Sequence, residues 1–126
     1  MSFENRHRLV YHADLGLFLV LAAPWVNAQL LTLIFSFGNT EVYQGNSALA
    51  INAFVGLMGV LGFGLSYLRL SIDDSRVVVA RSALVKALAA MWLFYAYACG
   101  LSPLFLVLAL MDAGALLLLL SSLRRR

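Results

Sequence analysis

Four apolar segments, each long enough to cross a membrane, follow one another along almost the whole chain. They cover about residues 12–37, 47–70, 77–100 and 103–123. An α-helix rises about 1.5 Å per residue, so about 20 residues cross the roughly 30 Å of hydrocarbon in a bilayer. Only 12% of the 126 residues are charged, against about 25% in soluble domains. The sequence therefore predicts a single all-α domain, residues 1–126, embedded in the lipid bilayer.

The first segment also has features of a secretory signal. Arg6 and Arg8 precede an apolar stretch, and residues 26–28 (Val-Asn-Ala) resemble a cleavage site with small residues. Apolar sequence resumes at once over residues 30–35, which favours a retained helix. Pro24 lacks a backbone donor and clashes with the preceding turn, so we expect a kink there.

The basic residues predict the orientation. Connections 38–46 and 100–102 contain no lysine or arginine. The arginines lie in the N-terminal arm, around the turn between the second and third segments, and at the C-terminus: Arg6, Arg8, Arg69, Arg76, Arg81, Arg124, Arg125 and Arg126. The positive-inside rule places both termini in the cytoplasm. These charges flank apolar runs and do not alternate with aromatics on one face, which argues against nucleic acid as a partner.

Short connections predict how the segments pack. Links of about nine, six and two or three residues make sequential helices antiparallel neighbours, as in a four-helix up-down-up-down bundle. Pro103 is expected to begin the fourth helix, and Asp74 or Ser75 to cap the third. Gly56, Gly59 and Gly62 form a strip that permits close helix packing. Packing within the bundle, a homodimer interface and a groove for a flat ligand remain alternative roles for this strip.

Two ionisable residues interrupt the apolar segments. Lys86 follows Arg76 by ten residues, and Asp112 precedes Arg124 by twelve, so both lie about 15–18 Å from the cytoplasmic edge. Opposite charges at one depth on consecutive antiparallel helices are expected to pair. The pair either fixes helix register or forms a proton-handling, ligand-binding or catalytic centre. Asp14 is expected near the cytoplasmic start of the first helix, where it complements the helix dipole.

A second polar layer is predicted about 24–26 Å from the cytoplasmic edge. It contains Asn27, Asn52 and Trp92, with Tyr95 slightly further out. These residues fit an ordinary belt of aromatics and amides at the outer interface. Alternatively, they line a pocket above Lys86 and Asp112 that binds a small amphipathic molecule.

No motif specifies a reaction. The sequence has no Gly-rich phosphate loop, nucleophile elbow or zinc-protease signature. His7 and His12 are five residues apart, a poor spacing for metal ligands, and neither a metal nor a cofactor is expected. The single cysteine, Cys99, excludes an internal disulfide.

The second half resembles small DoxX-like bacterial membrane proteins of four helices. The similarity covers residues 62–123: a glycine-rich helix ending in Tyr67, the turn at 73–76 (Asp-Asp-Ser-Arg), Lys86, and Asp112 before a leucine run. The resemblance implies a four-helix fold in the bacterial inner membrane, and it implies no particular chemistry.

These observations leave several functions open. The first is a membrane protein that binds a lipophilic or amphipathic small molecule, or that serves as an accessory subunit beside a larger membrane partner. The second is a proton-coupled transporter, dimeric in form, that uses Lys86 and Asp112. The third is an intramembrane isomerase or cyclase with Asp112 as acid or base.

Overall fold

The computed structural model describes residues 6–72 and 76–124, and most of these residues are helical. Three helices are each long and apolar enough to cross a membrane: α3 (Gly45–Ser71), α4 (Arg76–Ala98) and α5 (Leu104–Arg124). Their bounds lie within a few residues of the predicted segments, and Pro103 directly precedes α5 as expected. The predicted caps Asp74 and Ser75 lie outside the described residues.

The first segment is two helices, α1 (Arg6–Ala22) and α2 (Pro24–Ser36), which meet at an angle of 98°. Ala23 between them is extended, as expected because the residue before a proline is disfavoured in the α conformation. Pro24 then begins α2, where its missing N–H costs nothing. The expected kink at Pro24 is therefore a full break of the helix, and the first helix begins at Arg6, earlier than the expected His12.

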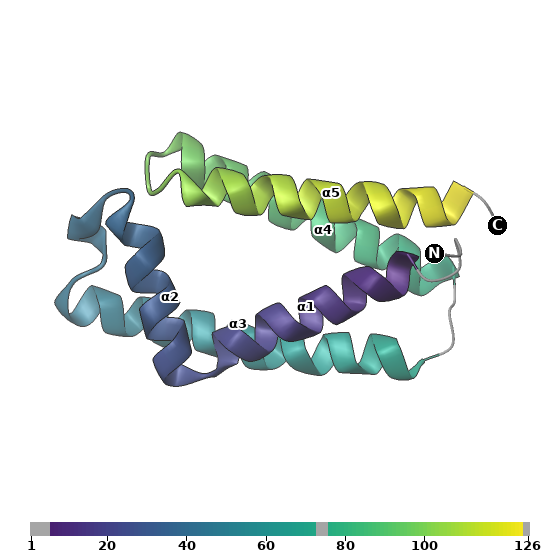
Figure 1. Ribbon diagram of the computed structural model, residues 1–126, viewed down its shortest axis with the longest axis horizontal. Helices are drawn as coiled ribbons and strands as arrows, with labels where there is room; N and C mark the ends of the chain where they lie inside the picture. Colours follow the sequence, from purple (N-terminus) through teal and green to yellow (C-terminus); the bar gives the residue numbers. More distant parts are fainter. Residues whose placement is uncertain (1–5, 73–75, 125–126) are drawn as a thin grey trace.

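The helices form two antiparallel pairs, α1 with α3 and α4 with α5 (Figure 1). The glycine strip of α3 packs against α1. A Cβ atom on Gly59 would lie 2.5 Å from the backbone nitrogen of Ala22, and one on Gly62 would overlap the ring of Phe18. Close packing within the molecule, one of the three roles considered for this strip, is therefore what the structure shows for Gly59 and Gly62.

Helices α3 and α4 are consecutive, yet they are not a closely packed pair. Contact between the two pairs runs through α1, α2, α4 and α5 instead. The predicted four-helix up-down-up-down bundle is therefore not confirmed. The short α2–α3 connection contains one turn of 3-10 helix, η2 (Thr40–Val42).

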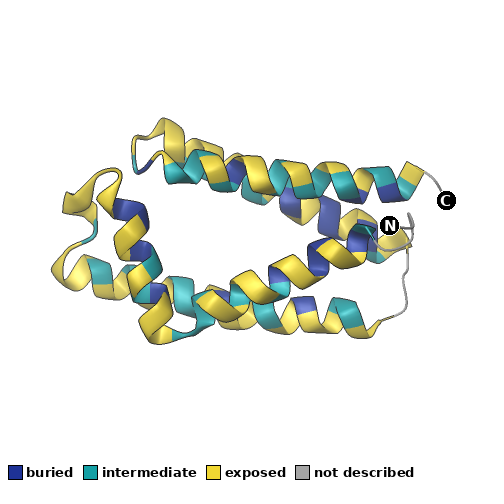
Figure 2. Cartoon of the chain, in the orientation of Figure 1, coloured by how far each residue is buried: buried dark blue, intermediate teal, exposed yellow. Residues whose placement is uncertain are grey.

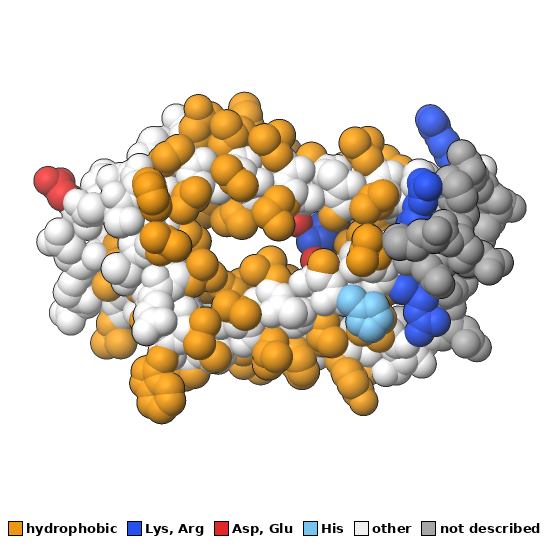
Figure 3. Space-filling model, in the orientation of Figure 1, with side chains coloured by type: hydrophobic (Ala, Val, Ile, Leu, Met, Phe, Trp, Pro, Cys, Tyr) orange, Lys and Arg blue, Asp and Glu red, His pale blue; other side chains and the backbone are white. Residues whose placement is uncertain are grey.

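One end of the molecule holds the start of α1, the end of α3, the start of α4 and the end of α5 (Figure 1). Arginine side chains gather there, drawn in blue in Figure 3. We call it the arginine-rich end, and its described arginines are Arg6, Arg8, Arg69, Arg76 and Arg124. Buried residues lie where helices face one another, while the outward faces are exposed and largely apolar (Figure 2). Such a surface suits lipid rather than water.

Candidate functional site

Two separate apolar clusters join the helix pairs. The inner cluster, nearer the arginine-rich end, consists of Val10 and Tyr11 from α1, Val79 and Ala83 from α4, and Leu119 from α5. The outer cluster consists of Leu31, Ile34 and Phe35 of α2, packed against Leu104, Phe105 and Leu108 of α5 among others. We call these two regions of contact, together with the polar contacts beside each cluster, the inner and outer closures.

The outer closure exists because α2 turns away from α1 and crosses toward α5 (Figure 1). The rings of Phe35 and Phe105 meet edge to face at 6.1 Å. The Ser102 hydroxyl donates to the carbonyl of Ile34 at 2.6 Å, and the Asn39 amide donates to the carbonyl of Leu101 at 3.0 Å. The break before Pro24 thus lets a single apolar segment contribute to both closures.

An opening lies between the two closures. Figure 3 shows it as a gap in the space-filling surface, bordered by hydrophobic side chains, with basic and acidic atoms together at the end facing the arginine-rich end. The ion pairs between described residues join only Lys86, Arg69, Asp14 and Asp112, so these charges belong to that group. The charged centre therefore adjoins an accessible apolar space and is not sealed in a dry core.

Lys86 of α4 bonds two aspartates at once. Its Nζ atom donates to Asp112 Oδ1 at 2.6 Å and to Asp14 Oδ1 at 2.5 Å. The predicted Lys86–Asp112 pair is confirmed, and Asp14 is an additional partner. Each contact offsets the cost of a charge in hydrocarbon, about 2.5–3.5 kcal/mol on insertion scales. The three charges therefore hold α1, α4 and α5 together.

The α4–α5 turn sets two of these residues at the same depth. Gly100 adopts φ +80°, a left-handed conformation that ends helices and favours glycine. The amide of Leu101 donates to the carbonyl of Ala96, which closes the turn. Lys86 and Asp112 then lie 14 residues before and 12 residues after Gly100, so they meet across the pair.

Arg69 of α3 completes the charge balance. Its Nη1 atom lies 3.8 Å from Asp14 Oδ2, and its guanidinium carbon lies 5.8 Å from the centroid of the Tyr11 ring. Two carboxylates, Asp14 and Asp112, thus face two cations, Lys86 and Arg69, with no net formal charge. The group, which we call the charge cluster, reaches from the arginine-rich end to the opening.

The charge cluster keeps hydrogen-bonding capacity toward the opening. An ammonium has three donors, and Lys86 uses two of them on Asp14 and Asp112. Within the described chain, Asp112 accepts through Oδ1 alone, and its side chain is 18% exposed against 5% for Asp14. Asp112 is therefore the more accessible of the two aspartates.

Asp14 is a member of the charge cluster that the sequence did not predict. The apolar pattern predicts a helix that starts at His12, but α1 begins at Arg6 and places Asp14 eight residues, about 12 Å, from its start. Residues 6–11 contain neither glycine nor proline. That uninterrupted stretch is the signal that the helix extends to Arg6.

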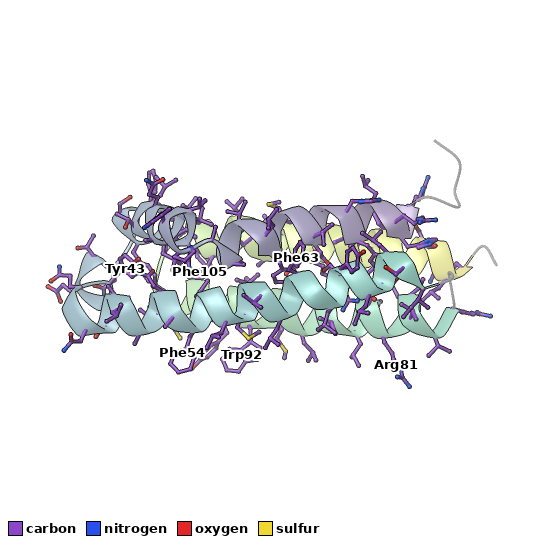
Figure 4. The ribbon with its side chains drawn as sticks, turned by 90° about the horizontal axis from the view of Figure 1, so that it is seen from below. Tyr43, Phe54, Phe63, Arg81, Trp92 and Phe105 are labelled. Carbon is purple, nitrogen blue, oxygen red and sulfur yellow. The ribbon has the colours of Figure 1, made fainter. Side chains whose placement is uncertain are left out.

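The predicted outer polar residues fall into two separate pairs. Asn27 is buried and donates through Nδ2 to the backbone carbonyl of Asn52 at 2.9 Å, while the Tyr43 hydroxyl donates to Asn52 Oδ1 at 2.5 Å. Trp92 and Tyr95 contact each other edge to face but are 67% and 59% exposed. Trp92 points outward, away from the packed helices (Figure 4). The structure does not bring the four residues together, and a ligand-binding role for them stays a prediction.

The two histidines differ in burial and in their contacts. His7 is buried, and its Nδ1 atom lies 3.2 Å from the Ser122 hydroxyl, whereas His12 is exposed. In the ranges 6–72 and 76–124, no group of three or more His, Cys, Asp or Glu residues is arranged to hold a metal ion. Cys99 is exposed near the end of α4.

No family model, curated protein or solved structure matches this chain.

Proposed function

We propose that this protein binds a lipophilic molecule with a small polar head, which lies in the opening and places its head on Asp112 and Lys86. The observation that carries this proposal is a charge cluster bordering an apolar opening in the middle of the span. Apolar walls with a few convergent polar groups are the usual composition of small-molecule sites.

The chemistry of the charge cluster defines the head group. The charges of Asp14, Asp112, Lys86 and Arg69 already balance, so an ionised ligand would leave an unpaired charge in hydrocarbon. A hydroxyl group is complementary, because it donates to the free oxygen of Asp112 and accepts the third N–H of Lys86. We therefore propose an uncharged amphipathic ligand, such as a long-chain alcohol.

The proposed setting is the bacterial inner membrane, with the arginine-rich end in the cytoplasm. The gathering of arginines at one end supports this orientation. The resemblance of residues 62–123 to DoxX-like proteins supports the setting and remains part of the proposal. An accessory role beside a larger membrane partner, or in a homodimer, is compatible with the exposed apolar faces of α3, α4 and α5.

Proton-coupled transport is the second candidate. It is favoured by the extent of the charge cluster, which runs from Arg69 at the arginine-rich end through Asp14 and Lys86 to Asp112 at the opening. Chains of acidic residues inside membranes commonly mark proton paths. In proteoliposomes that contain a pH-sensitive dye, this function predicts a proton flux that Asp112→Asn abolishes. An intramembrane enzyme that uses Asp112 gains no additional support.

Binding of radiolabelled hexadecanol to the purified full-length protein tests the first proposal. Wild type is expected to bind the alcohol saturably, and Asp112→Asn to weaken binding about tenfold, because a hydrogen bond to a charged group contributes about 1.5–3 kcal/mol. The matched control is Met111→Leu, since Met111 is adjacent on α5 and 65% exposed. Absence of saturable binding, or equal affinity in wild type and Asp112→Asn, contradicts the proposal.

A further inference from the structure

A depression in the surface lies at the arginine-rich end, between the start of α4 and the end of α5. A surface depression of about 580 Å³ is lined there by Arg76, Leu117, Leu120, Ser121, Leu123 and Arg124. We call it the α4–α5 depression. None of its lining residues belongs to the charge cluster, so it is distinct from the proposed ligand site.

The lining of the α4–α5 depression changes character along α5. Arg124 and Arg76 stand at the end of the molecule, while Leu117 lies seven residues before Arg124, about 10 Å deeper along the helix. Leu117 and Leu120 are 67% and 42% exposed. Cations at the membrane surface therefore continue into an exposed leucine surface at acyl-chain depth.

We propose that this depression binds an anionic phospholipid of the leaflet at the arginine-rich end. Its phosphate would lie between the guanidinium groups of Arg76 and Arg124, with an acyl chain along Leu117 and Leu120. Charge complementarity selects the occupant: two arginines line the site, and no carboxylate is among the described lining residues. Guanidinium groups match phosphate geometry, and basic residues near a membrane surface attract anionic lipids.

Native mass spectrometry of the full chain in micelles containing equal amounts of phosphatidylglycerol and phosphatidylcholine tests this proposal. The wild type is expected to retain phosphatidylglycerol preferentially. Each arginine near the surface contributes roughly a fivefold change in binding, so the double variant R76Q/R124Q is expected to lose most of that preference. The double variant R8Q/R81Q is the matched control, because it removes the same charge from two exposed residues outside the depression. Arg81 points away from the bundle (Figure 4).

The two double variants separate a built site from general charge attraction. Retained preference in R8Q/R81Q together with lost preference in R76Q/R124Q supports the site. Equal losses in both variants, or an unchanged preference in R76Q/R124Q, overturn it. Competition by glycerol phosphate as strong as that by phosphatidylglycerol would also overturn it, because the proposal requires the acyl chain to contribute. Circular dichroism of each variant checks that the helices are intact.

Discussion

The inner and outer closures join the same helix pairs by different chemistry. The inner closure combines an apolar cluster around Tyr11 and Leu119 with the ion pairs of Lys86. The outer closure uses aromatic rings, one serine hydroxyl and a backbone hydrogen bond between connections. Buried ion pairs tolerate little displacement, because separated charges in a medium of low dielectric are costly. We therefore expect the inner closure to stay fixed and the outer closure to yield when the opening widens.

Removing the cation of the inner closure is expected to have the largest effect. Lys86→Met deprives Asp112 of its ion-pair partner and leaves Asp14 with Arg69 at 3.8 Å. Loss of one partner from a buried ion pair typically costs about 3–5 kcal/mol. Unfolding by steric trapping in micelles measures this loss. A change below about 1 kcal/mol would show that the ion pairs do not secure the inner closure.

Widening the α1–α3 pair is expected to rank second. A Cβ on Gly59 meets the backbone of Ala22 at 2.5 Å, and relief requires a backbone shift that typically costs about 1–3 kcal/mol. Gly59→Ala should therefore destabilise the protein. Gly114→Ala is the control, because nothing lies within 4 Å of the added atom, and alanine favours the helix. Equal stability of the two variants would contradict the observed packing.

The outer closure is probed at Gly38, where an added Cβ would overlap the backbone of Leu101 and Ser102. Gly38→Ala is expected to lower the free energy of unfolding by only about 1 kcal/mol, near the low end for overpacking. The cost is small because the outer closure can separate without disturbing the charge cluster. The backbone amide of Asn39, which donates to the carbonyl of Leu101, should then lose protection from hydrogen exchange. Unchanged protection would show that this contact does not depend on the close approach.

The smallest effect is expected at Ser66 of α3. Its side chain is fully buried, and its hydroxyl has no hydrogen-bond partner within the described chain. Ser66→Ala removes an unsatisfied polar group, so thermal unfolding should show a neutral or slightly stabilising change, within about 1 kcal/mol. A clear loss of stability would reveal a hydrogen bond that the structure lacks.

The charge cluster was partly predictable from sequence. A two- or three-residue connection fixes the fourth segment beside the third, so equal depth was enough to pair Lys86 with Asp112. Asp14 is not predictable as a member from the apolar pattern, because that pattern begins at His12 whereas α1 begins at Arg6. The 98° bend between α1 and α2 was not predictable in extent. Pro24 marks the break, but the angle depends on how α2 packs against α5, a tertiary contact that no local pattern encodes.

The central claim is that one lysine bridges two aspartates inside the span, and solid-state NMR tests it directly. Lys86 is the only lysine in the sequence, so ¹⁵N-lysine labelling gives a single side-chain signal without further assignment. With ¹³C-aspartate in lipid bilayers, the Nζ signal should show dipolar coupling to two carboxyl carbons. Asp112→Asn should remove one coupling and Asp14→Asn the other. An Nζ signal without aspartate coupling in the wild type would contradict the charge cluster and the site built on it.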